Sequence, residues 1–178
     1  MANFGAFLPT LLSFEGGFVD DPVDPGGATN KGITLNTFSG CAGPLLGVAS
    51  TLENLRALTD EQAGRIYKAL YWDKMRGDDV GLQQLANIVV DFYVNAGITA
   101  ARLLQSSMNA CGAQPSLEVD GIIGSTTVRI LARVDQPAVY RRYKQSRLAY
   151  YQDLVANHPL LGKFLNGWLN RVNSFPDL

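Results

Sequence analysis

Apolar residues recur every three or four positions along most of this chain, and that spacing predicts a mostly helical protein. The first such group consists of Phe4, Phe7, Leu8, Leu11 and Leu12. It indicates an amphipathic helix within residues 1–14, and the paired glycines Gly16 and Gly17 predict its end. Similar spacing predicts further helices at residues 63–71, 82–94, 100–108 and 126–134. Two more are expected, one opened by Asp135 before Pro137 and one at residues 161–172.

The regions between these helices carry turn and cap signals. Residues 20–27 are dense in Asp, Pro and Gly and cannot form a regular helix. A short extended piece or hairpin is expected around residues 29–35, and a loop or a broken helix at residues 40–50. Thr59 and Gln62 have the spacing of a capping box, which predicts a helix start at residue 60. The expected fold class is mostly α, with a small irregular or β-hairpin element near the front.

Composition excludes several classes of function. The chain has 178 residues, of which 47% are hydrophobic, enough for a core in one compact domain or a domain with a packed appendage. Its net charge of −1 gives no basic field for nucleic acid. The apolar runs are too short to span a bilayer, and residues 1–14 do not resemble a signal peptide. Cys41 and Cys111 are expected to be free or buried thiols.

Glu15 is the first candidate for chemistry, because it ends an apolar helix face beside two glycines. A glycosidase needs a carboxylic acid that keeps its proton near neutral pH, and apolar surroundings favour the protonated form. Phe14 and Phe18 can supply such surroundings. The alternative is a solvated glutamate at a helix C-terminus, although a negative charge is mismatched to that end of the helix dipole.

Asp24 is the second candidate carboxylate, nine residues after Glu15 on the turn-rich loop. Glycoside hydrolysis uses two acids, one that protonates the leaving oxygen and one that activates water or stabilises developing positive charge. Asp20 and Asp21 are rival candidates, and any of the three can instead hold its own backbone in an Asx-turn. Calcium binding is disfavoured, because the EF-hand spacing is absent.

Two later regions offer possible substrate contacts. Asp91 lies in the apolar helix expected at residues 82–94, and Asn95 directly follows it. Because they are four residues apart, the two side chains share one helix face. Instead of binding substrate, Asp91 can make a hydrogen bond that fixes the core, and Asn95 can cap the end of the helix. Trp72 can stack on a sugar ring or pack in the core, and Tyr67 is expected to lie in the core. The single histidine, His158, has no metal-ligand or triad pattern around it, so we expect neither a metal nor a cofactor.

Four sequence blocks stand out, namely FEGGF at residues 14–18, DPVDPGGATNKGIT at 21–34, YWD at 71–73 and DFYVNAG at 91–97. They resemble glycoside hydrolase family 108, whose members are N-acetylmuramidases of phage lysis cassettes and of regions near secretion genes. The resemblance implies a lysozyme-like helical fold. It also implies cleavage of the β-1,4 bond between N-acetylmuramic acid and N-acetylglucosamine, with Glu15 as the catalytic glutamate.

From residue 100 onward the chain resembles the predicted peptidoglycan-binding domain that follows this catalytic part. The matching blocks are LQ at residues 104–105, DGIIG at 120–124 and GWLNR at 167–171. We therefore expect a catalytic part at residues 1–97 and a helical, peptidoglycan-binding-like part packed against it at 98–178. Without a flexible linker near Gly97, the second part can also simply complete the fold around the cleft.

A looser similarity to phage-type lysozymes concerns a Glu, Asp and Thr arranged around a small hairpin. Glu15 and Asp24 have the separation of the first two. Counting back from Gly32, the threonine position falls on Asn30, and Thr29 is its neighbour. Either residue can therefore assist the water, and the sequence leaves open whether the reaction inverts or retains the anomeric configuration.

The residues and the resemblance together predict a muramidase in which Glu15 is the acid and Asp24 positions or activates water with help from Thr29 or Asn30. The expected substrate-binding residues are Asn30, Asp91, Asn95 and Trp72. The expected partner is the peptidoglycan glycan strand, with no nucleic acid and no membrane insertion, and the expected state is a monomer. The protein is expected to be made in the cytoplasm and to reach the cell wall through a holin or a secretion system. One alternative is an inactive peptidoglycan-binding or secretion-accessory protein. Another is a regulator that acts by protein contact.

Overall fold

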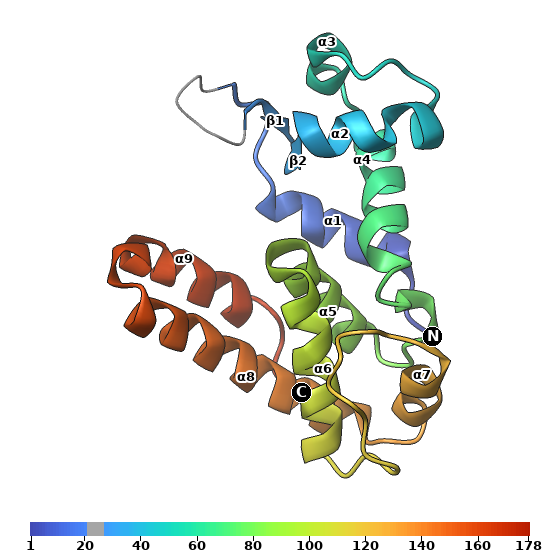
Figure 1. Ribbon diagram of the computed structural model, residues 1–178, viewed down its shortest axis with the longest axis vertical. Coiled ribbons are helices and arrows are strands. Elements are labelled where there is room, and N and C mark those ends of the chain that lie inside the picture. Colours follow the sequence, from blue (N-terminus) through green and yellow to red (C-terminus); the bar gives the residue numbers. More distant parts are fainter. Residues whose placement is uncertain (21–26) are drawn as a thin grey trace. The chain divides into compact units, whose positions relative to one another are not determined.

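The computed structural model describes residues 1–20 and 27–178, and these form nine α-helices and one two-stranded antiparallel sheet (Figure 1). The expected fold class, mostly α with a small hairpin, is confirmed. The described residues divide into two compact units. We call Phe4–Trp72 the N-terminal unit, and Met1–Asn3 together with Asp73–Leu178 the C-terminal unit.

The N-terminal unit packs its helices around an apolar core. Its elements are α1 (Phe4–Phe14), β1 (Thr29–Asn30), β2 (Ile33–Thr34), α2 (Leu35–Cys41), α3 (Leu52–Arg56) and α4 (Asp60–Tyr67). The fully buried side chains include Phe7 and Leu11 from α1, Phe38 from α2 and Ile66 from α4. The apolar spacing of the first helix therefore gives the buried face that the sequence predicts.

Two helix starts in this unit follow from local side-chain chemistry. Thr59 caps α4, accepting a hydrogen bond from the Gln62 main-chain nitrogen at 3.2 Å while the Gln62 side chain accepts one from the Thr59 nitrogen at 3.1 Å. The expected capping box is thus confirmed. Thr34 caps α2 in the simpler way, by accepting from the Thr37 nitrogen.

The hairpin at residues 29–34 is set by its two-residue turn. Thr29 pairs with Thr34, and Asn30 pairs with Ile33. Both turn residues, Lys31 and Gly32, have positive φ angles of 49° and 73°. Positive φ at both central residues is the type I′ pattern, whose twist matches that of the flanking strands. The expected hairpin around residues 29–35 is confirmed.

The segment at residues 35–50 is more helical than the sequence indicates. It forms α2 and then a π-helical turn over Ala42–Leu46, which ends at Gly47 with a φ of 70°. A broken helix was one of the two expectations for residues 40–50. The helix α2 itself was not predicted, because its residues include Asn, Thr, Ser and Gly, which have low helix propensity.

The C-terminal unit consists mainly of packed helices, of which α8 (Gln136–Asn157) is the longest. Its helices are α5 (Gln83–Ala96), α6 (Ile98–Ala110), α7 (Ser125–Leu131), α8 and α9 (Gly162–Asn173). The helix α5 packs against α6 and α8, and α8 packs against α9 (Figure 1). Asp135 caps α8 by accepting a hydrogen bond from the Ala138 nitrogen at 3.2 Å. The predicted helices are present, with ends that differ by a few residues.

The first three residues of the chain join the C-terminal unit through their main chain. The Ala2 nitrogen donates to the Val80 carbonyl at 2.7 Å. The Asn3 nitrogen donates to Gln83 Oε1 at 2.7 Å, and Gln83 Nε2 donates back to the Asn3 carbonyl. The chain therefore starts on one unit and enters the other at Phe4.

A buried glutamine fixes the DGIIG block between α6 and α7. Gln105 donates to Asp120 Oδ1 at 2.7 Å and to the Ile122 carbonyl, and it accepts from the Gly121 nitrogen. The hydrogen bond from Gln105 is the main reason that the pKa of Asp120 lies below its ordinary value. This block of the peptidoglycan-domain resemblance is thus held in a defined conformation.

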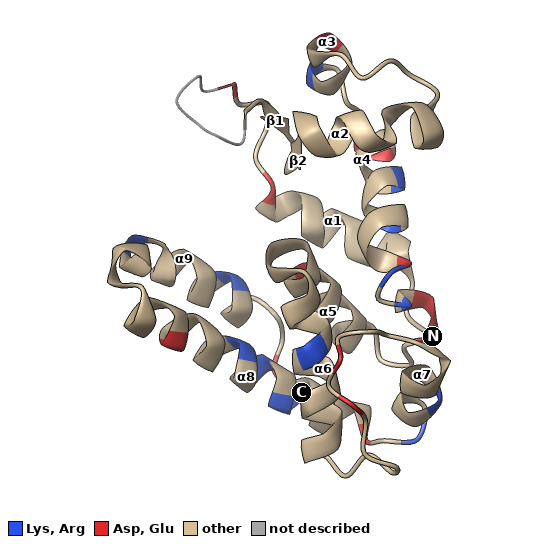
Figure 2. Cartoon of the chain, in the orientation of Figure 1, with Lys and Arg blue, Asp and Glu red and all other residues tan. Residues whose placement is uncertain are grey.

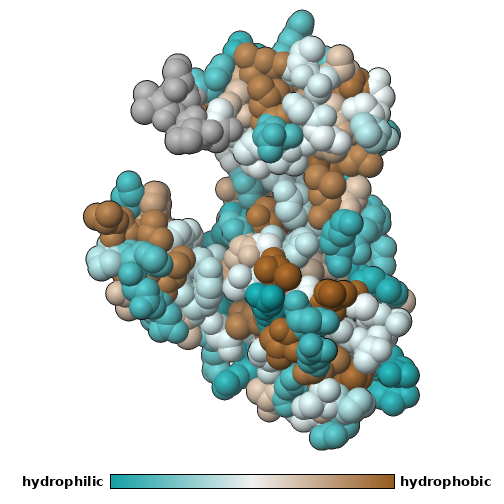
Figure 3. Space-filling model, in the orientation of Figure 1, coloured by the Kyte–Doolittle hydropathy of each residue, from teal (hydrophilic) through white to brown (hydrophobic). Residues whose placement is uncertain are grey.

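Charged residues are scattered over both units, and α1 carries none within its bounds (Figure 2). On the face drawn in Figure 3, hydrophobic and hydrophilic residues are interspersed. Within residues 1–20 and 27–178, every helix is either too short or too polar to span a bilayer. Cys41 and Cys111 are free thiols, as expected, and Cys41 is buried.

Candidate active site

Glu15 lies immediately after α1, where the chain turns towards the hairpin. Its main-chain nitrogen donates to the Leu12 carbonyl at 3.2 Å, and its side chain is half-buried. The residues after Glu15 run beside the hairpin, because the main-chain nitrogen of Lys31 donates to the Gly16 carbonyl at 3.1 Å. Val19 and Thr29 exchange two main-chain hydrogen bonds of 2.8 Å. These contacts bring Glu15 to the hairpin turn.

The Glu15 carboxyl group lies directly against Gly32. A Cβ atom placed on Gly32 would be 2.8 Å from Glu15 Cδ and closer still to Glu15 Oε2. The same Cβ would lie 2.5 Å from the Tyr67 hydroxyl oxygen. Such distances are shorter than real Cβ contacts, so only glycine leaves room for both groups. Gly32 therefore serves both the positive φ of the turn and the close approach of two side chains.

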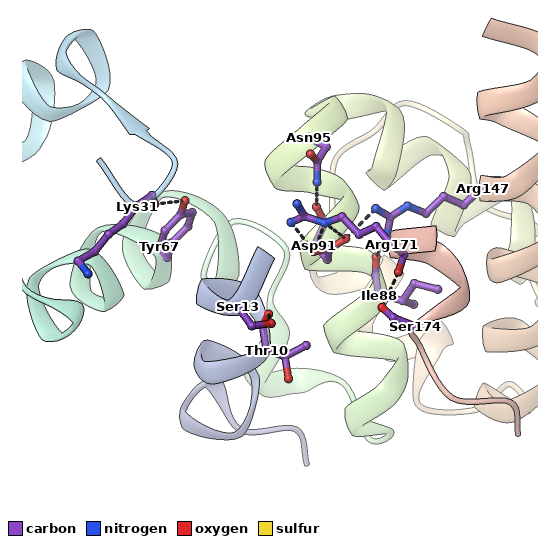
Figure 4. A network of polar contacts seen from close by, with 10 residues as sticks. All are labelled: Thr10, Ser13, Lys31, Tyr67, Ile88, Asp91, Asn95, Arg147, Arg171 and Ser174. Carbon is purple, nitrogen blue, oxygen red and sulfur yellow. Dashed lines mark hydrogen bonds and ion pairs between the residues drawn. The ribbon is translucent and has the colours of Figure 1, made fainter. Parts of the chain in front are cut away.

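Tyr67 is the last residue of α4, and its hydroxyl group reaches the hairpin turn at Gly32, next to the Glu15 carboxyl group. Its side chain is 1% exposed, and its hydroxyl donates to the Lys31 carbonyl at 2.8 Å (Figure 4). Lys31 in turn pairs its ammonium group with Asp60, the first residue of α4, at 2.6 Å. We call Glu15, Lys31, Gly32 and Tyr67 the Glu15 cluster.

Phe18 lies three residues after Glu15 in the sequence, and its ring contacts Arg56. The Arg56 guanidinium carbon lies 4.4 Å from the centroid of the Phe18 ring, at cation–π distance. Phe14 and Phe18 are both half-buried. Their expected role as apolar surroundings for the Glu15 carboxyl group stays a prediction.

Thr29 and Asn30 lie on the first strand of the hairpin. Thr29 is half-buried, and its hydroxyl donates to the Gly27 carbonyl at a long 3.4 Å. Asn30 is only 5% exposed, and its amide nitrogen donates to the carbonyls of Leu55 at 2.8 Å and Arg56 at 3.1 Å. Asn30 thus ties the hairpin to the end of α3. The expected roles of both residues towards water or substrate stay predictions.

Asp24, the expected second carboxylate, and its rival Asp21 lie outside the described residues. Asp20 is described and exposed. The structure therefore places Glu15, Thr29 and Asn30 around one hairpin, and the partner acid stays a prediction.

Trp72 is a core residue of the N-terminal unit. Its side chain is 0% exposed, and its ring stacks on Phe7 at 5.6 Å between centroids and meets Phe4 edge-on at 5.5 Å. In this position its ring faces have protein neighbours. The structure therefore supports the core alternative and gives no support to the expected contact between Trp72 and a sugar ring.

Asp91 belongs to a buried ion network in the C-terminal unit (Figure 4). Its side chain is 0% exposed and binds Arg147 of α8 at 2.7 Å and Arg171 of α9 at 2.7 Å. Asn95 is exposed and donates from Nδ2 to the Asp91 carbonyl at 2.7 Å. These contacts favour the structural alternative for both residues, and their substrate contacts stay predictions.

Sequence reasoning missed two features of these sites. Tyr67 was expected to be in the core, and its hydroxyl contact with the hairpin carries no local signal, since the partner is a main-chain carbonyl 36 residues away. Arg147 had a usable signal. It sits four residues from Tyr143 and four from Tyr151, on the face of α8 that is buried.

The chain is similar to known proteins over most of its length. The model of the family described as Glycosyl hydrolase 108 matches residues 8–97, and that of the Predicted Peptidoglycan domain matches residues 99–173. Among solved structures, Brucella abortus SagA is 32% identical with a TM-score of 0.74, over 97% of this chain and 90% of that one. A comparison with curated proteins gave no match. The chain belongs to the glycosyl hydrolase 108 family and carries the predicted peptidoglycan domain in its C-terminal part.

Proposed function

We propose that the protein is an N-acetylmuramidase that cuts the β-1,4 bond between N-acetylmuramic acid and N-acetylglucosamine, with Glu15 as the general acid. The observation that carries this proposal is the placement of the Glu15 carboxyl group at the end of α1, against the hairpin turn at Gly32. Membership of a glycosyl hydrolase family and the peptidoglycan domain support a peptidoglycan hydrolase in general.

In the proposed reaction Glu15 donates its proton to the bridging oxygen, which leaves as the 4-hydroxyl of N-acetylglucosamine. The bond from this oxygen to C1 of N-acetylmuramic acid breaks, and positive charge develops on the muramic acid ring. Water then supplies the new hydroxyl group at C1. Asp24 takes the role of the second carboxylate, with Thr29 or Asn30 beside the water. General acid catalysis of this kind contributes about 10²- to 10⁴-fold in rate.

The products of digestion test this function. Purified peptidoglycan is incubated with the protein, and the fragments are reduced with borohydride and sequenced by mass spectrometry. Reduced N-acetylmuramic acid at the new chain end is the expected result, because the muramic acid C1 is freed. Reduced N-acetylglucosamine at that end would instead indicate a glucosaminidase. The anomer formed first, followed by NMR, distinguishes inversion from retention.

A second candidate function is peptidoglycan binding without cleavage, which the match of the predicted peptidoglycan domain to residues 99–173 favours. The two functions separate in one pull-down assay, because a binding protein remains on the insoluble wall while releasing no fragments. In either case the proposed place of action is the bacterial cell wall, reached with a holin or a secretion system.

A further inference from the structure

We propose that Tyr67 is a positioning residue for Glu15, and that its hydroxyl group, anchored on the hairpin main chain, keeps the Glu15 carboxyl group in the orientation needed for proton donation. This inference rests on the proposed function of Glu15 as the acid. In this proposal Tyr67 acts through Glu15 and does not bind the substrate.

The first support is that Tyr67 is held rigidly. Its ring is 1% exposed and lies 5.5 Å from the ring of Tyr71 between centroids. Its hydroxyl donates to the Lys31 carbonyl at 2.8 Å. A buried ring with its polar end bonded to main chain has little rotational freedom, so the hydroxyl oxygen is a fixed point.

The second support is that α4 contacts the hairpin turn at both of its ends. Its first residue, Asp60, pairs with the Lys31 ammonium at 2.6 Å, and its last residue, Tyr67, binds the Lys31 carbonyl. The capping box at Thr59 and Gln62 fixes the start of the same helix. Lys31 is thus held through both side chain and main chain, which fixes the adjacent Gly32.

The third support is the shared contact at Gly32. Glu15 Oε2 and the Tyr67 hydroxyl oxygen both lie within 2.5 Å of the position that a Cβ of Gly32 would occupy. The two oxygens are therefore close neighbours, on the side of Gly32 where a larger residue would carry its side chain. The charged groups on the packed elements, Lys31 of the hairpin and Asp60 of α4, are paired with each other.

This arrangement matters because proton donation depends on geometry. A carboxyl group at the end of a helix has several rotamers, and a misplacement of about 1 Å can cost about 10²-fold in rate. A wall made of the Gly32 backbone and the Tyr67 hydroxyl limits these rotamers. Loss of the hydroxyl is expected to slow the step in which the leaving oxygen takes the proton and to leave substrate binding unchanged.

The test is Tyr67→Phe, which keeps the ring and removes the hydroxyl. On soluble peptidoglycan oligomers we expect kcat to fall about tenfold, a partial loss of the acid's contribution, with KM unchanged. A second substrate is a nitrophenyl β-glycoside of the N-acetylglucosamine–N-acetylmuramic acid disaccharide. Nitrophenolate leaves without a proton, so Glu15→Gln and Tyr67→Phe should both cleave this glycoside at nearly the wild-type rate.

Tyr143→Phe is the matched control. Tyr143 is also a fully buried tyrosine whose hydroxyl donates to a main-chain carbonyl, that of Ala100 at 3.2 Å in the C-terminal unit. The variant Tyr143→Phe is expected to keep wild-type kcat on both substrates.

If Tyr67→Phe does not fold, Gly32→Ala probes the same contact. Gly47→Ala is its control, because Gly47 has a similar φ of 70° with open space around it.

The outcomes separate this inference from the proposed function. Wild-type kcat for Tyr67→Phe on the oligomers, while Glu15→Gln is inactive there, overturns the positioning role alone. Equal losses on the oligomers and on the nitrophenyl glycoside also overturn it, since they indicate a general structural defect. Full activity of Glu15→Gln on the oligomers overturns the proposed acid itself.

Discussion

At the scale of single residues, buried hydrogen bonds fix the position of the hairpin beside Glu15. Asn30 donates both of its amide hydrogens to the carbonyls of Leu55 and Arg56 at the end of α3. Buried polar groups stabilise a fold when they are hydrogen-bonded, and here one buried amide bonds to two main-chain carbonyls. Asn30 therefore positions the strand that leads into Lys31 and Gly32.

Replacing Asn30 by alanine tests this structural role. Asn30→Ala is expected to lower the free energy of unfolding by about 1–3 kcal/mol, because the carbonyls of Leu55 and Arg56 each lose a hydrogen bond. Thermal melts followed by circular dichroism measure the change. Asn36→Ala, at an exposed position of α2, serves as the control and should melt like wild type. Unchanged stability with weaker binding to peptidoglycan would contradict this account and favour a substrate contact for Asn30.

The residue scale also shows how far the sequence can lead. Glu15 and the turn at Lys31 and Gly32 are marked by glycines beside them in the sequence. Tyr67 is not marked, because its contact with the hairpin depends on how α4 packs within the N-terminal unit. The core role of Trp72 has the same origin, since its neighbours Phe4 and Phe7 come from the opposite end of that unit's sequence.

At the scale of elements, one carboxylate joins three helices of the C-terminal unit. Asp91 of α5 accepts hydrogen bonds from Arg147 of α8 and from Arg171 of α9 (Figure 4). The Arg147 guanidinium also lies 4.8 Å from the centroid of the Phe92 ring, at cation–π distance. A buried charge of this kind is tolerated only with its partners in place.

Asp91→Asn removes the negative charge and leaves a buried guanidinium without its counter-charge. The expected loss is about 3–5 kcal/mol in the free energy of unfolding, as for other broken buried ion pairs. Urea denaturation of the full chain measures it. Asp177→Asn is the control, because Asp177 also pairs with a basic side chain, that of Lys144, but is itself 97% exposed. A loss no larger than that of this control would contradict the structural role of Asp91.

Element boundaries followed the sequence where a helix has a clear apolar face or a cap. The start of α4 was given by its capping box and the start of α8 by Asp135. The helix α2 and the π-helical turns over Ala42–Leu46 and Lys68–Trp72 were not foreseen. Their residues have weak helix propensity or lie at a helix end, so packing within the N-terminal unit decides their conformation.

At the scale of the whole molecule, the chain divides between Trp72 and Asp73, whereas the expected division into catalytic and binding parts lies at residues 97 and 98. The helix α5 explains why a compact unit begins before residue 97. Seven of its residues are buried, and it packs against α6 and α8. The functional division at residues 97 and 98 stays a prediction.

The stability of the C-terminal unit is expected to fall in alkaline solution. Burial and the nearby Asp177 raise the pKa of Tyr140 from 10.0 to about 12, and burial raises the pKa of Tyr143 well above 10.0. The unfolded chain therefore loses these protons at lower pH than the folded one. Stability is full below pH 10 and decreases as the pH rises towards 12.

Urea denaturation at a series of pH values from 8 to 12, in steps of about half a unit, measures this decrease. Tyr140→Phe and Tyr143→Phe should each reduce the slope of unfolding free energy against pH above 10, because each removes one titrating group. A slope unchanged in both variants would contradict the assignment to these two tyrosines.

The most direct measurement of the central claim compares wild type, Glu15→Gln and Glu53→Gln on purified peptidoglycan by the release of reducing ends. Gln has the shape of Glu but no proton to donate, and Glu53 is an exposed glutamate on α3 that serves as the matched control. The account predicts release by wild type and by Glu53→Gln, and a loss of at least about 10²-fold for Glu15→Gln. Equal release by all three proteins would contradict the assignment of Glu15 as the acid.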